Sequence, residues 1–216
     1  MTIQQMLFML VGGMGTSIQI FLVTLLFSLP LGLLVAFGRM SKNRPLQTAV
    51  KVYISIMRGT PLMLQLMVVY FGPYYLFHIK VGSSYRLWAT FIGFVINYAA
   101  YFAEIYRSGI QSMPQGQYEA AKILGYSKFQ TFFKIIFPQV VKRILPSVTN
   151  EVITLVKDTS LAFTLSVSEM FSIAKALAAS QTNMIPFVAA GLFYYIFNLI
   201  VAVGMEWVEK KLSYYQ

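Results

Sequence analysis

The order of apolar and polar positions divides the chain into five long apolar stretches. They run roughly over residues 16–37, 52–77, 87–106, 144–166 and 187–207. A helix needs about 20 residues to cross the hydrocarbon core of a bilayer, and each stretch reaches that length. Continuous apolar runs such as Ile18–Leu26 lack the alternation that a barrel strand requires. The pattern predicts an all-α membrane protein with five transmembrane helices in a single domain over residues 1–216.

Composition agrees with this fold class and removes several kinds of site. Apolar residues make up 57% of the chain and charged residues 11%, with a mean hydropathy of +0.66. Soluble domains carry about 25% charged residues, so this chain cannot cover a water-facing surface in the usual way. The absence of cysteine excludes disulfides, thiolate nucleophiles and cysteine-ligated metals. A single histidine, His78, leaves no histidine cluster, so we expect no metal site.

The positive charge is distributed unevenly along the chain, whose formal net charge is +10. Twelve cations lie between spans one and two, between spans three and four, or after span five: Arg39, Lys42, Arg44, Lys51, Arg107, Lys122, Lys128, Lys134, Lys142, Arg143, Lys210 and Lys211. The opposite side holds Lys80, Arg86 and Lys175. Cytoplasmic loops attract the positive excess, which predicts an external N-terminus and an internal C-terminus. Cations that flank spans do not form a nucleic-acid-binding surface, so no nucleic acid partner is expected.

The segment 111–138, which we call the elbow, is long for a connection between two spans. It predicts a short helix over Gln117–Leu124, ended by Gly125 in the left-handed conformation. Ser127 can cap a second helix, which Pro138 is expected to close. The apolar stripe of that second helix comprises Phe129, Phe132, Phe133 and Ile136. On these grounds alone, an amphipathic connector lying on the membrane surface is an equal alternative to a functional element.

Particular residues of the elbow resemble a known motif. Glu119-Ala120-Ala121, followed by Gly125 and then by Pro138, is similar to the EAA loop of binding-protein-dependent ABC importers, although Phe137 stands where leucine is usual in that family. The resemblance continues over almost the whole chain. The motifs that resemble permease subunits for polar amino acids are Arg58-Gly59-Thr60-Pro61, Asn97-Tyr98-Ala99-Ala100-Tyr101, Glu104-Ile105-Tyr106-Arg107 and Lys157-Asp158-Thr159-Ser160-Leu161.

The resemblance implies a set of partners. Five helices per subunit would form the transmembrane domain of a multi-pass protein in the cytoplasmic membrane of a prokaryote, surrounded by membrane lipid and paired with a second permease, expected to be an identical copy. The elbow would be the coupling helix, seated in a cytoplasmic ABC ATPase subunit present in two copies. An extracytoplasmic amino-acid-binding protein would deliver the substrate. The residues implied in coupling are Gln117, Glu119, Ala120, Ala121, Gly125 and Pro138.

The sequence also lacks a phosphate-binding loop, which agrees with the assignment to a permease subunit. The chain has no G-x-x-x-x-G-K-[ST] sequence, so it cannot cradle ATP phosphates itself. We therefore expect no cofactor on this chain, with ATP and Mg²⁺ held by the partner ATPase. The chain is expected to be a transport subunit and not an enzyme.

Ionisable residues inside the spans mark a candidate path for the substrate, because such residues usually face a bundle interior or a water-filled route. They are Arg58, Glu104, Glu151, Lys157 and Asp158. Arg58 and Glu104 lie about 9–10 Å to the cytoplasmic side of their span centres, at 1.5 Å per residue, and this equal depth allows an ion pair between them. Two interpretations of that pair are open: a structural bridge, or a contact with the solute.

Helical spacing extends the path. Asn97, Tyr101, Glu104 and Ser108 share one helix face. Gly59 and Pro61 are expected to weaken the helix after Arg58 and to free backbone groups that can line a cavity. The candidate path residues are Arg58, Gly59, Thr60, Pro61, Gln65, Asn97, Tyr101, Glu104, Lys157, Asp158, Ser160 and Leu161.

A free amino acid is a zwitterion, so its site needs an acceptor for the ammonium group and donors for the carboxylate. Glu104 and Asp158 fit the first role, and a second carboxylate suits a basic side chain. The resemblance implies an ATP-driven permease that moves polar amino acids by alternating access, and the two acids add the hypothesis that basic amino acids are preferred. The alternative is an ion-coupled secondary transporter with a proton or sodium ion on one of these acids, although no internal repeat is evident. A third class, an intramembrane enzyme, would rest on Lys157 and Ser160 alone.

Overall fold

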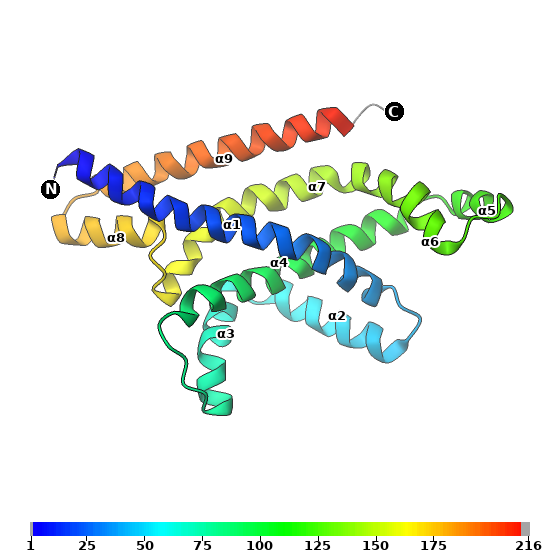
Figure 1. The fold of residues 1–216 in the computed structure, drawn as a ribbon, viewed down its shortest axis with the longest axis horizontal. Coiled ribbons are helices and arrows are strands. Elements are labelled where there is room, and N and C mark those ends of the chain that lie inside the picture. Colours follow the sequence, from blue (N-terminus) through cyan, green and yellow to red (C-terminus); the bar gives the residue numbers. More distant parts are fainter. Residues whose placement is uncertain (1, 213–216) are drawn as a thin grey trace.

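The fold is an elongated bundle of helices, seen in a computed structural model that describes residues 2–212. The long helices α1 (Ile3–Arg39), α4 (Tyr85–Gln111), α7 (Phe137–Asp158) and α9 (Ile185–Leu212) run along the long axis of the molecule (Figure 1). The N-terminus and α8 (Met170–Gln181) lie at one end. The elbow and the C-terminal end of α9 lie at the other, so the two ends of the bundle are chemically distinct.

The number of membrane crossings agrees with the sequence. Helices α1, α4 and α9 are each long and apolar enough to cross a membrane. Two bent pairs pass the same test together: α2 (Arg44–Gly59) with α3 (Leu62–Phe77), bent by 114°, and the run Lys128–Leu165 with α8, bent by 59°. With each pair taken as one crossing, the total is five. The prediction of an all-α protein with five transmembrane helices is confirmed.

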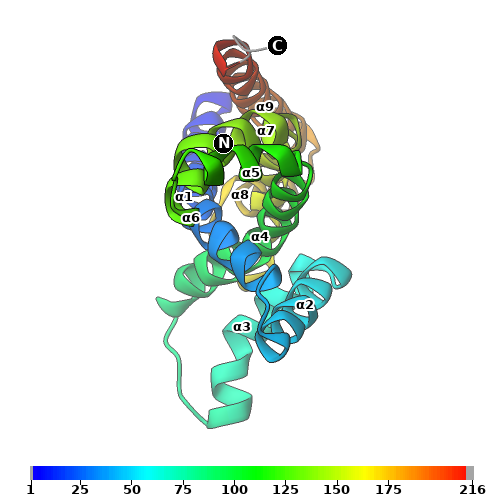
Figure 2. The ribbon, with the colours of Figure 1, turned by 90° about the vertical axis from the view of Figure 1, so that its right-hand side faces the viewer.

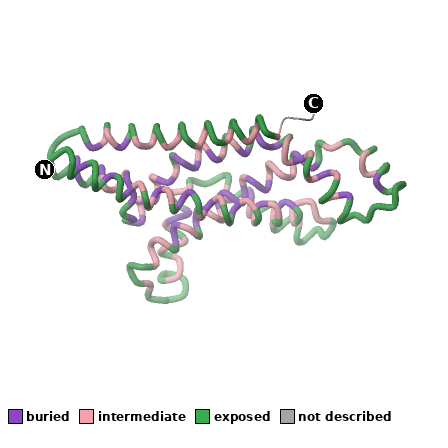
Figure 3. Tube along the Cα trace, turned by 45° about the horizontal axis from the view of Figure 1, so that its top comes forward, coloured by how far each residue is buried: buried purple, intermediate pink, exposed green. Residues whose placement is uncertain are grey.

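The bundle is held together by close packing of α1 on α4. A Cβ atom at Gly32 would lie 2.8 Å from Phe102 Cβ and 3.1 Å from Ala99 O, so only glycine allows the two backbones to approach this closely. Fully buried aromatic side chains of α4, among them Phe94 and Tyr98, occupy the centre of the core. Burial concentrates on the central helices, whereas α9 is largely exposed along its length (Figure 3). Its apolar outer surface is suited to lipid.

The bend between α2 and α3 lies at Thr60-Pro61. Proline disfavours a helical conformation in the residue before it, and Thr60 is extended, with φ −124° and ψ 150°. Viewed from the elbow end, α2 and α3 lie beside the remaining helices and outside the main bundle (Figure 2). Tyr53 of α2 ties this part to α4 by donating its hydroxyl hydrogen to Ile96 O. The sequence predicted a weakened helix after Arg58, and in the structure the helix is fully interrupted there.

The elbow contains the predicted turn but not the predicted end of its second helix. The short helix α5 (Gln115–Ile123) is followed by Gly125 at φ +79°, and Ser127 caps the next helix by accepting a hydrogen bond from Gln130 N at 3.2 Å. That helix does not end at Pro138, as expected from the sequence. It runs through α6 (Lys128–Gln130), the π-helical turn η1 (Thr131–Ile136) and α7 without a break. Proline has no N–H to donate, and it falls in the first turn after η1, where the hydrogen-bond pattern has already changed.

The opposite end is organised by a buried carboxylate. After α7 the chain forms the 3₁₀ helix η2 (Thr159–Leu165) and then α8. Glu169, which is fully buried, caps α8 by accepting hydrogen bonds from Phe171 N at 2.7 Å and Ser172 N at 2.6 Å. Tyr194 of α9 donates its hydroxyl to the same carboxylate at 3.0 Å. Glu169 therefore joins α8 to α9.

Candidate functional site

A charged cavity of about 390 Å³ lies between α4, α7 and the end of α2. Tyr101, Glu104 and Ser108, which the helical spacing placed on one face, all line it. Arg58 enters from α2, and Ser147 and Glu151 enter from α7. The predicted face of α4 is therefore confirmed for these three positions, and the cavity adds a second acidic residue opposite them.

The ion pair that equal depth allowed between Arg58 and Glu104 is not formed, because Glu104 has other partners. Glu104 Oε2 lies 2.6 Å from Arg107 Nη2, and its Oε1 lies 3.8 Å from Arg39 Nε. Arg107 lies three residues after Glu104 on the same helix. Side chains at this spacing are neighbours on the helix surface, so the Arg107 guanidinium reaches the Glu104 carboxylate directly. The Arg58 guanidinium lies instead 5.4 Å from the centre of the Tyr101 ring, at a distance typical of a cation–π contact.

Glu151 is the second acidic residue of the cavity; the sequence placed it among the ionisable span residues but not in the final list of candidate path residues. Its side chain is half-buried and makes no hydrogen bond or ion pair with residues 2–212. Arg143, Ser147 and Glu151 follow one another at intervals of four along α7, so helical spacing alone could have grouped them. What the sequence does not show is that this face of α7 lies against α4.

The residues at the end of α7 lie away from this cavity. Asp158 Oδ2 accepts a hydrogen bond from Tyr98 at 2.7 Å, while Lys157 is exposed. Ser160 donates its hydroxyl to the backbone oxygen of Lys157 at 2.8 Å. Leu161 packs at the edge of the core. These four residues lie at the junction of α7 and η2, and none of them is among the described residues that line the charged cavity.

Gln65 and Asn97 form a buried hydrogen-bonded pair behind the break. Their exposed fractions are 7% and 4%, and Asn97 Nδ2 donates to Gln65 Oε1 at 2.8 Å. In a continuous helix Met57 O would accept from the N–H of residue 61, but Pro61 has none. Asn97 Nδ2 and Gln65 Nε2 donate to Met57 O instead, at 3.1 and 2.9 Å.

Gln65 also binds Thr60, the last residue before Pro61. Gln65 Nε2 also approaches Thr60 O at 3.1 Å and Thr60 Oγ1 at 2.8 Å. At this break the backbone oxygens of Met57 and Thr60 are therefore bound by protein side chains. This gives Gln65 and Asn97 a positioning role for Arg58, which follows Met57 directly.

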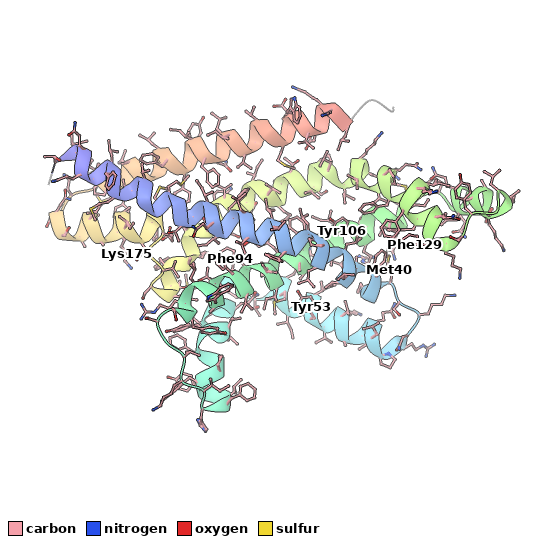
Figure 4. The ribbon with its side chains drawn as sticks, in the orientation of Figure 1. Met40, Tyr53, Phe94, Tyr106, Phe129 and Lys175 are labelled. Atoms are coloured by element: carbon pink, nitrogen blue, oxygen red, sulfur yellow. The ribbon has the colours of Figure 1, made fainter. Side chains whose placement is uncertain are left out.

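The elbow presents one face to the bundle and the other outward. Ala121 is 1% exposed, and Gln117 exchanges two 2.9 Å hydrogen bonds with Gln139 of α7, so both are engaged within the chain. Glu119 and Ala120 are exposed, as are Gly125 and Pro138. Large apolar side chains at the tip are also exposed: Ile123 by 85%, Leu124 by 73% and Phe129 by 71%. Figure 4 shows Phe129 at this end and Lys175 of α8 at the other.

The chain matches one protein family over most of its length. The family described as "Binding-protein-dependent transport system inner membrane component" matches residues 28–214. Among curated relatives, the arginine transport system permease protein ArtQ of Bacillus subtilis is 35% identical over 213 residues, which cover 98% of this chain and 95% of the relative. The putative glutamine transport system permease protein GlnP of Rickettsia bellii is 34% identical, covering 94% and 92%.

Solved structures give the same result. A chain of the structure titled "Crystal structure of an amino acid ABC transporter with histidines" superimposes with a TM-score of 0.83 at 26% identity, covering 94% of both chains. An inward-facing methionine ABC transporter, MetNI, shares the fold with a TM-score of 0.77 at 17% identity, covering 99% of this chain and 100% of the other. The chain therefore belongs to the family of binding-protein-dependent transport system inner membrane components and is a multi-pass permease subunit of a polar amino acid ABC importer.

Proposed function

We propose that this permease moves polar amino acids, with a preference for basic ones, by ATP-driven alternating access. The observation that carries the proposal is the charged cavity, in which two cations, Arg58 and Arg143, and two carboxylates surround one space of about 390 Å³. This volume falls within the range of about 300–1,000 Å³ that small-molecule sites occupy. The names of the relatives, which include arginine and glutamine permeases, support the same class of solute.

The charges of the cavity match an amino acid with a basic side chain. Arg58 can bind the α-carboxylate, because a guanidinium presents paired donors to a carboxylate. The Glu151 carboxylate faces the positive charge of Arg58 but accepts no hydrogen bond from the described residues, so its oxygens can accept one from a solute. Glu104 is neutralised by Arg107 and Arg39, so it adds a polarised carboxylate and little net charge. Glu151 is then the residue that would distinguish a basic side chain from a neutral one.

The outward face of the elbow is suited to a cytoplasmic ATPase subunit. Ten of the twelve cations on the predicted cytoplasmic side belong to the two loops between spans, which supports an internal elbow and C-terminus with the N-terminus outside. The exposed Ile123 and Leu124, next to Glu119 and Ala120, offer an apolar surface that a partner can bury.

The remaining subunits follow from this placement. A homodimer of the permease would contact two ATPase subunits, which bind ATP and Mg²⁺, and a binding protein would deliver the solute at the end that carries α8. Because the helices from Lys128 to Asp158 are continuous, movement of the elbow would reach the cavity as a rigid-body displacement of α7.

Uptake by the reconstituted complex tests the proposal. Proteoliposomes that contain the permease with its copurifying subunits and an added binding protein should accumulate arginine only when ATP is supplied on the elbow side. Uptake should persist when an uncoupler collapses the ion gradient. Uptake that follows the ion gradient and ignores ATP would instead identify an ion-coupled secondary transporter.

Substitution of Glu151 tests the assignment of the cavity. Glu151→Gln removes a charge-assisted contact of about 1.5–3 kcal/mol, so the concentration of arginine for half-maximal uptake should rise about 10–150-fold, while that of glutamine changes little. Glu206→Gln is the matched control, because this exposed acid pairs with Lys210 at 2.8 Å outside the cavity. Equal effects on both solutes would remove Glu151 from basic-side-chain recognition.

A further inference from the structure

A second and larger cavity, of about 1050 Å³, opens at the elbow end of the bundle. Its walls come from three parts of the chain that are distant in sequence. Met113 and Gln117 belong to the elbow, Lys142 and Leu145 to α7, and Leu212 to the end of α9. No step of the proposed transport mechanism uses this space, although Arg143 lines both this cavity and the charged one.

The wall of this cavity is strongly cationic. Lys134, Lys142 and Arg143 line it, whereas Glu209 is its one acidic residue within the described chain. Glu209 Oε1 already accepts a hydrogen bond from Thr149 at 2.5 Å. Arg143 Nη1 is anchored on Ser112, at 2.7 Å from its backbone oxygen and 3.2 Å from its hydroxyl. A guanidinium has five N–H donors, so most of them stay available to an anion.

Apart from the Gln117–Gln139 pair, the rest of the lining is apolar, and the residues nearby indicate that the cavity lies at the depth of the lipid headgroups. Ile135, Pro146 and Leu212 supply apolar surface beside the cations. Trp207 is exposed one to two turns before Leu212, with the Lys211 ammonium 5.0 Å from its ring centre. Exposed tryptophan next to lysine at the end of an apolar helix is typical of the membrane interface. A ligand at this position meets water on one side and acyl chains along α9 on the other.

We propose that this cavity binds the headgroup of an anionic phospholipid from the cytoplasmic leaflet. The phosphate would lie among Lys134, Lys142 and Arg143, and the acyl chains would follow the exposed apolar surface of α9. Basic pockets between transmembrane helices on the cytoplasmic side are a recurring form of lipid headgroup site. The Gln117–Gln139 pair lines the same space, so a bound headgroup would support the position of the elbow against α7.

Native mass spectrometry of the full chain with its copurifying subunits tests this proposal. The complex is exchanged into detergent with equal amounts of phosphatidylglycerol and phosphatidylcholine that carry the same acyl chains. We expect the complex to retain phosphatidylglycerol selectively. Lys134→Gln combined with Lys142→Gln should weaken this retention about 30-fold, since each cation near the headgroup contributes about a factor of five.

The matched control replaces two exposed cations of the elbow that lie outside the cavity, Lys122→Gln combined with Lys128→Gln, and should retain the lipid. Circular dichroism and the elution volume establish that each variant is folded, and Lys134→Gln alone provides a milder change that should still lower retention, by about a factor of five. Equal retention of the two lipids, equal loss in the control pair, or displacement of the lipid by excess inorganic phosphate would each overturn the proposal. Displacement would identify a site for free anions. Because this readout involves no solute and no ATP, it is independent of the proposed transport function.

Discussion

Replacing Asn97 by leucine tests whether the Gln65–Asn97 pair holds the bend between α2 and α3. The substitution removes two hydrogen bonds, to Gln65 Oε1 at 2.8 Å and to Met57 O at 3.1 Å. Met57 O keeps its second donor, Gln65 Nε2, at 2.9 Å. Gln65 Oε1 keeps none within the described chain, in a residue that is 7% exposed.

The expected loss of stability follows from that single unsatisfied atom. A buried acceptor without a donor costs about 1–3 kcal/mol, and the net loss of a hydrogen bond adds about 1 kcal/mol. The free energy of unfolding should therefore fall by about 2–4 kcal/mol. For a chain of 150–250 residues, each kcal/mol corresponds to roughly 2–4 °C, so the apparent Tm should fall by about 4–16 °C.

Thermal unfolding of the purified permease, followed by tryptophan fluorescence, measures this shift. Thr90→Val on the same helix is the control, because the Thr90 hydroxyl donates only to Arg86 O, at 2.9 Å within α4. The control should lose less than about 4 °C. Because Arg58 follows Met57, Asn97→Leu should also raise the arginine concentration needed for half-maximal uptake. An Asn97→Leu protein that melts together with the control would refute the role of the pair.

Three further substitutions probe other parts of the fold. Gly32→Ala forces α1 away from α4 and should destabilise the protein by about 1–3 kcal/mol in thermal unfolding, whereas Gly15→Ala, whose Cβ meets no atom within 4 Å, should be neutral or stabilising. Gly125→Ala strains a residue at φ +79° by about 1–2 kcal/mol and should lower transport and solute-stimulated ATP hydrolysis together. Gly125→Asn should have a milder effect, because asparagine tolerates the left-handed conformation. Unchanged coupling in both variants would contradict the role of the turn. Glu169→Ala leaves the Tyr194 hydroxyl and two backbone donors without their acceptor and should lower the apparent Tm by several degrees; an unchanged Tm would show that Glu169 does not stabilise α8.

The membrane architecture was predictable because it depends on length and composition alone. A bilayer imposes one thickness on every crossing, so five apolar stretches are enough to give five spans. The break in the second span was also foreseeable, since Gly59 and Pro61 act locally on the helix. Pro138 illustrates the limit of the same reasoning: the sequence does not show that the preceding turn is π-helical, and the predicted end of the helix was wrong.

The cavity was predictable only where it depends on a single helix. The positions of Tyr101, Glu104 and Ser108 follow from the helical period and were correct. The partner of Glu104 was not, because Arg107 competes from the same helix and Arg39 arrives from α1. Glu151 joins the site through the packing of α7 on α4, which one sequence does not display.

Single-cysteine cross-linking tests the central claim, that work done by an ATPase enters the bundle through the elbow. The chain contains no cysteine, so Ile123→Cys places one thiol on the tip of α5, at a position that is 85% exposed. In native membranes a short bifunctional reagent should join this thiol to a copurifying ATPase subunit, and a membrane-impermeant thiol reagent should reach it only from the cytoplasmic side. Labelling from the outer side, or an intact cytoplasmic complex with no cross-link to an ATPase subunit, would contradict the account.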